Sequence, residues 1–237
     1  MKNKALPQAL TFAIFTVILF LTCILFFMIF KQENDVQTRP ANTNDLPTVI
    51  IDAGHGGMDG GAVGVNGVLE KELNLEMATV LSALMRVSGY NVVTTRTDDT
   101  MLTTEDGRGT AKNQDLKKRL EIASEYPEGL MISLHCNKFP SENCKGLQVY
   151  YSENELARDT ASSIQDTVAR LLQTTNHRKP KQADSSIYLL NRAVTPSVLV
   201  ECGFLSNTEE CNLLCDEGYR KKLALCILCG INEKYGS

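Results

Sequence analysis

The chain has 237 residues, of which 43% are hydrophobic and 22% are charged, and its formal net charge is −4. This length suits one domain or at most two small ones, and the composition is that of a globular protein. A negative net charge argues against nucleic acid as a partner, and against an anionic membrane surface as the main binding partner.

The first predicted element is the apolar run from Ala9 to Phe30, in which only threonines interrupt the hydrophobic residues. At about 1.5 Å per residue, a helix of this length crosses the roughly 30 Å core of a bilayer. Lys2 and Lys4 precede the run, and no small-residue cleavage site follows it. We therefore expect residues 1–8 to be cytoplasmic and residues 9–30 to be an uncleaved transmembrane signal-anchor. A cleaved or lipid-modified signal is the alternative.

The remaining chain divides into a linker and one domain. Residues 31–47 are polar and rich in turn-forming residues, which is typical of a linker. Residues 48–235 are long enough to build a substantial core. If residues 9–30 are an anchor, this domain lies outside the cytoplasm.

Strands and helices alternate along the predicted domain. The predicted strands are residues 49–51, 90–95, 130–134, 147–151, 187–190 and 198–200. The predicted helices are residues 70–87, 116–124, 156–172 and 219–231, from apolar residues at helical spacing. Residues 97–115 and 174–186 are polar and read as surface loops. The alternation predicts an α/β fold with a mostly parallel or mixed central sheet, flanked by helices on both faces.

A glycine-rich segment, Asp52-Ala53-Gly54-His55-Gly56-Gly57, follows the first predicted strand. It lacks the spacing and the Gly-Lys-Ser/Thr ending of a phosphate-binding loop. Glycines let the backbone bend sharply at the end of a strand, so the segment presents His55 at the rim of the sheet. The alternative is a tight turn with an incidental surface histidine.

Two further strand ends, and one helix start, carry side chains that can bind a metal ion or transfer a proton. The strand at 130–134 runs into His135, the strand at 198–200 runs into Glu201, and Glu70 opens the helix after the first loop. Ligands of α/β sheets gather at strand ends. Two imidazoles and one carboxylate form the ligand set of a catalytic Zn²⁺, which leaves one position for water and lowers the pKa of that water to about 7.

We therefore predict that His55, Glu70 and His135 bind one Zn²⁺, and that Glu201 moves protons as general base and acid. Three of these residues also have an alternative interpretation that involves neither a metal ion nor catalysis. His135 would be a hydrogen-bonded histidine of the core, Glu70 an acid that favours a helix start, and Glu201 an ion-pair partner. Glu72 competes with Glu70 for the ligand position.

The cysteines are interpreted as structural. Cys136 follows His135 and Cys202 follows Glu201, so in a strand both would point away from the site and into the core. Cys226 and Cys229 fall on the apolar face of the last predicted helix, where core packing is the better reading. The sequence leaves undecided whether a disulfide bond such as Cys211–Cys226 forms.

Four ordered blocks resemble the signature blocks of zinc-dependent N-acetylmuramoyl-L-alanine amidases. They are Asp52-Ala53-Gly54-His55-Gly56-Gly57, Glu70-Lys71, Ser133-Leu134-His135-Cys136-Asn137 and Glu201-Cys202-Gly203-Phe204-Leu205-Ser206-Asn207. The resemblance implies His55, Glu70 and His135 as zinc ligands and Glu201 as catalytic acid–base. Asp52 and Asn137, within these blocks, are candidates for substrate binding or for supporting the ligands. Ala53 departs from the family, which usually has proline there.

The resemblance also implies a substrate and a setting. The family hydrolyses the amide between the lactyl group of muramic acid and the L-alanine of the peptidoglycan stem peptide. The short chain with one N-terminal anchor is most similar to the germination-specific type of spore-forming bacteria, which acts on the spore cortex. An accessory activating protein would then be a partner. A zinc peptidase or deacetylase of the cell wall, or a non-catalytic wall-binding protein on the same fold, are the alternatives.

Overall fold

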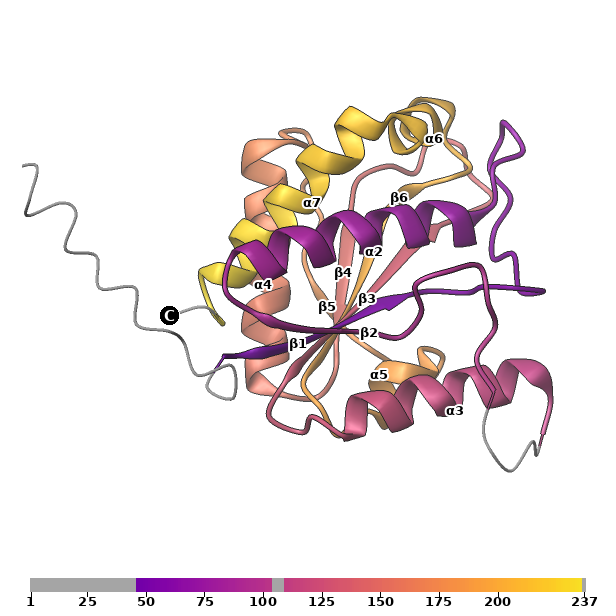
Figure 1. Ribbon diagram of the computed structural model, residues 1–237. Coiled ribbons are helices and arrows are strands. Elements are labelled where there is room, and N and C mark those ends of the chain that lie inside the picture. The colour runs from indigo at the N-terminus through magenta and orange to yellow at the C-terminus, as the bar shows by residue number, and fades with distance from the viewer. Residues whose placement is uncertain (1–45, 104–108, 236–237) are drawn as a thin grey trace, which may run out of the picture. The chain divides into compact units, whose positions relative to one another are not determined.

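A six-stranded sheet forms the centre of the computed structural model, which describes residues 46–103 and 109–235 (Figure 1). Its strands are β1 (Thr48–Ala53), β2 (Asn91–Thr94), β3 (Leu130–Asn137), β4 (Gln148–Tyr151), β5 (Lys181–Gln182) and β6 (Ser197–Phe204). They lie in the order β2-β1-β3-β6-β4-β5. Only β4 and β6 pair antiparallel within this sheet, and the other neighbours are parallel. The predicted mixed sheet is confirmed.

Helices cover both faces of the sheet, as predicted. They are α2 (Glu70–Val87), α3 (Ala111–Ser124), α4 (Glu155–Leu171), α5 (Tyr188–Arg192), α6 (Thr208–Cys215) and α7 (Glu217–Asn232). Side chains of α2, α4, α6 and α7 form one core with the sheet, and side chains of α3 and α5 form the other. In Figure 1, α2 and α7 lie on one side of the strands, and α3 and α5 lie on the opposite side.

The alternation of side chains along the strands positions the site. Ile50, Met131 and Leu199 point to the α3 and α5 side, where they join the smaller core. Two residues further along each of these strands, and also four residues further along β3, the same face carries polar groups, because strand side chains repeat every second residue. The residues at these positions include Asp52, Ser133, His135 and Glu201. The apolar face therefore becomes polar toward the carboxyl ends of β1, β3 and β6.

The cysteines follow the same alternation. Cys136 and Cys202 are buried in the larger core, on the face opposite to His135 and Glu201, as predicted. Cys226 is also part of that core. All seven cysteines of the described residues are free thiols, so the Cys211–Cys226 bridge is not formed.

One predicted strand and one predicted helix start are wrong, and two short elements were not predicted. Residues 187–190 do not form a strand, because Leu189 and Leu190 pack under α3 as part of the helix α5. A run of four apolar residues fits the side-chain spacing of a strand and that of a helix, so packing decides which of the two forms. The helix α3 begins at Ala111 instead of residue 116, since the Thr110 side chain accepts a hydrogen bond from the Asn113 amide and caps it. The short elements α6 and β5 were not predicted.

The predicted tail, residues 1–8, and the predicted anchor, residues 9–30, lie outside the described residues, as does most of the predicted linker, 31–47. Among the helices that the structure describes, none has the length and apolar character to cross a membrane. The described residues all belong to one compact unit.

Candidate metal centre

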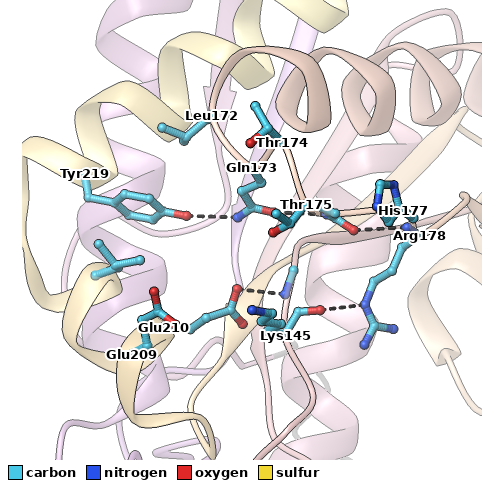
Figure 2. A pocket seen from close by; sticks show the side chains of 13 residues that line it. Lys145, Leu172, Gln173, Thr174, Thr175, His177, Arg178, Glu209, Glu210 and Tyr219 are labelled. Atoms are coloured by element: carbon cyan, nitrogen blue, oxygen red, sulfur yellow. Dashed lines mark hydrogen bonds between the residues drawn. The ribbon is translucent and has the colours of Figure 1, made fainter.

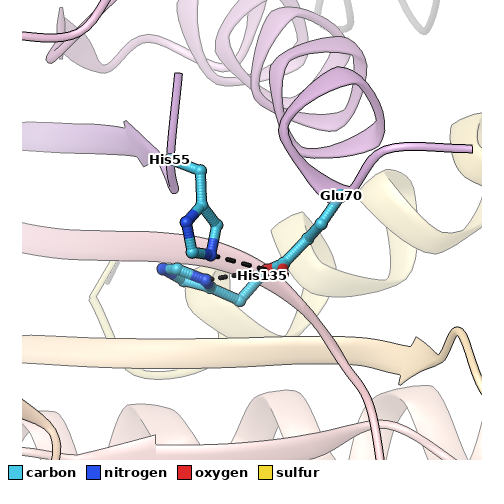
Figure 3. A group of neighbouring side chains, drawn as sticks. All are labelled: His55, Glu70 and His135. Carbon is cyan, nitrogen blue, oxygen red and sulfur yellow. Dashed lines mark hydrogen bonds and ion pairs between the residues drawn. The ribbon is translucent and has the colours of Figure 1, made fainter. Parts of the chain in front are cut away.

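His55, Glu70 and His135 meet at the carboxyl ends of β1 and β3, and their possible ligand atoms all lie within 4.8 Å of one another (Figure 3). His55 Nε2 is 3.2 Å from Glu70 Oε2. His135 Nδ1 is 2.9 Å from Glu70 Oε1. The two imidazoles meet edge to face, with ring centroids 5.0 Å apart. The structure thus brings together the three residues predicted as ligands.

His55 has an unusual backbone conformation, with φ of 63°. Left-handed conformations are uncommon for residues other than glycine, although histidine is enriched among the exceptions. The ring is fixed by Asp59, whose Oδ2 lies 3.0 Å from Nδ1. Burial lowers the pKa of His55, but hydrogen bonds and charges of Glu70 and Asp59 outweigh it and raise the pKa. With Nδ1 on Asp59, Nε2 is the atom directed at Glu70.

Asp59 is a functional candidate that the sequence reading missed. A carboxylate on the far nitrogen of a metal-binding histidine fixes the tautomer and the orientation of the ring. The available signal was a carboxylate four residues after His55, two residues beyond the glycine-rich segment and directly before Gly60 and Gly61.

Glu70 is buried at the first position of α2 and is held by several donors. Its Oε2 accepts from the Ala62 amide at 2.8 Å, and its Oε1 accepts from the Cys136 amide at 3.1 Å. Burial raises the pKa of Glu70, but hydrogen bonds and charges of His135 and His55 lower it far below its usual range. Glu72 is exposed, so the geometry favours Glu70.

Two glycines leave the space that the cluster occupies. A Cβ on Gly54 would lie 2.3 Å from His135 Cε1. A Cβ on Gly61 would lie 2.7 Å from both Glu70 Oε2 and His55 Cδ2. The glycine-rich loop therefore does more than bend the chain, since it allows two backbone segments to approach the imidazoles and the carboxylate.

Glu201 lies beside this cluster on β6, where it pairs in register with His135 of β3. Its Oε2 is buried and has no hydrogen-bond partner among the described residues. Burial raises the pKa of Glu201 to about 7, and the Glu70 charge adds to that effect, while His135 and His55 oppose it. A carboxyl group with a pKa near neutrality can both accept and donate a proton.

His55, His135 and Glu201 line one pocket of about 260 Å³ together with α3 and the segment that leads into α5, and Glu70 is not among the residues that line it. Glu70 closes the cluster from the α2 side, as Figure 3 shows. The donor set, two imidazole nitrogens and a carboxylate, fits a divalent ion that prefers nitrogen and oxygen ligands.

Asp52 and Asn137 have different positions. Asp52 is fully buried, contacts Arg119, and accepts from Ser133 Oγ at 2.6 Å and Thr95 Oγ1 at 2.7 Å. It lies on the floor of the pocket and supports the surrounding elements. Asn137 follows the shift in register between β3 and β6 and is not among the residues that line the pocket. A role of either in substrate binding stays a prediction.

A larger pocket, of about 460 Å³, lies elsewhere, between the end of α4 and the helices α6 and α7 (Figure 2). Two pairs of its polar groups are joined by hydrogen bonds. Gln173 Nε2 donates to Tyr219 Oη at 2.9 Å, and Glu210 Oε1 accepts from the Gly146 amide at 2.7 Å. His177 is exposed at its rim. Neither the metal cluster nor Glu201 contributes to this pocket.

Comparison with known proteins agrees with this geometry. Residues 49–233 match the N-acetylmuramoyl-L-alanine amidase family. The germination-specific N-acetylmuramoyl-L-alanine amidase of Bacillus subtilis (strain 168) is 39% identical over 189 residues, which cover 77% of this chain and 77% of that protein. The CwlD amidase of Clostridioides difficile, solved in complex with the GerS lipoprotein, superposes with a TM-score of 0.75 at 39% identity, over 80% of this chain and 98% of that one.

A more distant structure has the same fold. An N-acetylmuramoyl-L-alanine amidase of Nostoc punctiforme superposes with a TM-score of 0.70 at 29% identity, over 81% of this chain and 98% of that one. Since the family match covers nearly all of the described residues and includes every residue of the cluster, this chain belongs to the N-acetylmuramoyl-L-alanine amidase family.

Proposed function

We propose that this protein is a zinc-dependent amidase of peptidoglycan, which hydrolyses the amide between N-acetylmuramic acid and the L-alanine of the stem peptide. One observation carries the proposal: the cluster of His55, Glu70 and His135 opens into the same pocket as Glu201, in a chain of the amidase family. The metal ligands and a separate proton carrier are thus together at one end of the sheet.

His55, Glu70 and His135 would hold the zinc ion, since they offer two imidazoles and one carboxylate from three different elements. Zinc bound there supplies a Lewis acid that polarises a carbonyl group and makes water acidic enough to react near neutral pH. The Asp59 carboxylate contacts Nδ1 of His55, so that Nε2 is the nitrogen available for the metal. The amides of Ala62 and Cys136 orient the carboxylate of Glu70.

Glu201 would move the protons of the reaction. Its carboxylate takes a proton from the attacking water and gives a proton to the leaving nitrogen of L-alanine, as a general base and then a general acid. A buried oxygen without a partner suits this role, because no protein group has to be displaced before the proton binds. The pKa of about 7 places both protonation states within reach near neutral pH.

The setting of the reaction is inferred from the relatives. A germination-specific amidase at 39% identity supports a role in the spore cortex. The complex of the Clostridioides difficile amidase with a lipoprotein supports an accessory partner. The apolar residues 9–30 support a membrane anchor, with the catalytic domain, residues 48–235, outside the cytoplasm.

The test is to measure zinc content and products together on the full chain. Wild-type protein is expected to hold about one zinc and to release stem peptides with a free L-alanine amine, as seen by mass spectrometry of muropeptides. Glu201→Gln should retain zinc and lose turnover by at least about 100-fold, because only the proton carrier is removed. Glu70→Ala should lose both, whereas Glu72→Ala should lose neither because Glu72 is exposed.

Different products would point to a different reaction. New carboxyl ends within the stem peptide would indicate a peptidase, and released acetate would indicate a deacetylase. Normal turnover by Glu201→Gln would contradict the role of Glu201, and release of zinc by Glu72→Ala alone would contradict the ligand set.

A further inference from the structure

Arg96 lies between the two segments that carry His55 and Glu70. It follows β2 and is 5% exposed. Its Nε donates to the Ala53 carbonyl at 2.9 Å, and its Nη2 donates to the Gly54 carbonyl at 3.0 Å. The same Nη2 donates to the Lys71 carbonyl at 2.9 Å, in the first turn of α2. One guanidinium group therefore joins the residues just before His55 to the residue just after Glu70.

The His55 loop needs such support because its backbone conformation is uncommon. Three successive carbonyls, those of Ala53, Gly54 and His55, accept hydrogen bonds from arginine side chains. Arg119 supplies the bond to His55 and a second bond to Ala53, and its guanidinium also pairs with Asp52 and Asp115. Of the two arginines, Arg96 is the one that also bonds α2. It adds to two weaker or more exposed links between the segments: Asn74 Nδ2 donates to the Gly54 carbonyl at 3.2 Å, and Lys71 Nζ donates to the Gly57 carbonyl at 2.8 Å.

The contacts of Arg96 are directional and not mainly ionic. Within the described parts of the chain, no carboxylate lies within ion-pair distance of its guanidinium, and its remaining bond goes from Nη1 to the Asp98 carbonyl at 2.9 Å. A guanidinium is a rigid planar group whose donors point along fixed directions, whereas a lysine offers one ammonium on a flexible chain. A lysine at this position would keep the charge and lose the link between the two segments.

We propose that Arg96 is a positioning residue that sets the distance between His55 and Glu70, and thereby the affinity of the cluster for its metal ion. This inference rests on the proposed metal site. The hydrogen bonds of Arg96 all go to backbone carbonyls, and it is not among the residues that line the pocket, so it acts through the backbone of the two segments that it joins.

Arg220 offers a matched control. It is 8% exposed on α7, bonds a backbone carbonyl, that of Leu214, at 2.7 Å, and pairs with Glu76 at 2.6 Å. None of these partners belongs to the cluster. Substitution of Arg220 therefore removes a guanidinium that is similarly buried, and that differs from Arg96 by its ion pair to Glu76 of α2, without changing the link between the His55 loop and the first turn of α2.

The experiment compares Arg96→Lys with Arg220→Lys in the full chain. Two quantities are measured: the thermal midpoint without metal, and zinc affinity by competition with a chromophoric chelator. Both variants should lose some thermal stability. Arg96→Lys should bind zinc about 10-fold to 100-fold more weakly than wild type, which is the range for residues that support ligands. Arg220→Lys should bind zinc with wild-type affinity.

Two results would overturn the inference: wild-type zinc affinity in Arg96→Lys, or an equal loss in Arg220→Lys at matched stability. Arg96→Gln provides a second variant, and failure of both Arg96 variants to fold would assign the residue to the fold instead of the metal site. Absence of zinc binding by the wild-type protein would refute the proposed function itself, which distinguishes that failure from wild-type affinity in an Arg96 variant.

Discussion

Gly54 is the residue that limits how closely the His55 loop approaches His135. It has no Cβ, and a methyl group there would lie 2.3 Å from Cε1 and 2.4 Å from Nε2 of that ring. Real Cβ atoms do not come so close to a ring, so the imidazole would have to move. Because the ring is packed against Glu70 and His55, any movement changes the ligand cluster.

We predict that Gly54→Ala weakens zinc binding by at least about 10-fold, since a metal site needs its ligands within fractions of an ångström. The matched control is Gly60→Ala in the same loop, where the nearest side-chain atom, of Leu69, is 3.7 Å from the added Cβ. Neither glycine has a positive φ, so backbone strain does not separate the two variants. Chelator competition measures both, and equal affinities would contradict the observed position of His135.

At the scale of elements, Asp216 connects two helices. It ends α6 and caps α7, and its Oδ1 accepts a hydrogen bond from the Tyr219 amide at 2.6 Å. The amides at a helix start have no partner within the helix, so a side-chain oxygen there stabilises it. The helix α7 then packs against the sheet as part of the larger core.

Asp216→Ala is expected to lower the free energy of unfolding by about 1 kcal/mol, whereas Asp216→Asn, which still offers an oxygen, should lose much less. Urea denaturation of the metal-free chain measures both variants. Zinc affinity should stay unchanged, because α7 carries none of the three proposed ligands. Equal destabilisation by alanine and asparagine would show that the charge of Asp216, and not its role as a hydrogen-bond acceptor, stabilises the helix.

At the scale of the whole molecule, the metal-free protein should depend on pH through the groups at its site. In the folded state the pKa of Glu201 is raised to about 7. In an unfolded chain it is about 4.3, so protonated Glu201 stabilises the fold below that value, and this contribution is lost as the pH rises to about 7. The raised pKa of His55 acts in the same direction, because stability present at low pH is lost as the imidazolium deprotonates.

We therefore predict that the metal-free protein is less stable at pH 8 than at pH 5, by on the order of 3 kcal/mol for Glu201 alone. Urea denaturation in the presence of a chelator measures the difference. Glu201→Gln should flatten the profile, since the amide does not titrate. Excess zinc should reverse it, because metal ions bind deprotonated ligands and stabilise the folded state. A flat wild-type profile would contradict the burial of Glu201.

The elements could be predicted where the sequence has a clear period. Apolar residues at helical spacing gave α2 its observed bounds, Glu70–Val87, and a polar face opposite an apolar one marked α4 and α7. The prediction of a strand at 187–190 was wrong because four consecutive apolar residues show neither strand nor helix spacing. The packing of Leu189 and Leu190 under α3 favours a helix there. Short elements such as β5 depend on a neighbouring strand and leave no local pattern.

The sequence by itself determined which chemical groups the candidate site contains. His55, His135 and Glu201 stand at strand ends and Glu70 at a helix start, and parallel strand ends gather at one edge of a sheet. The tertiary structure alone decided what holds these groups. Arg96 reaches the carbonyls of Ala53 and Gly54 from more than forty residues away, and contacts between such distant segments follow from packing, which no local pattern encodes.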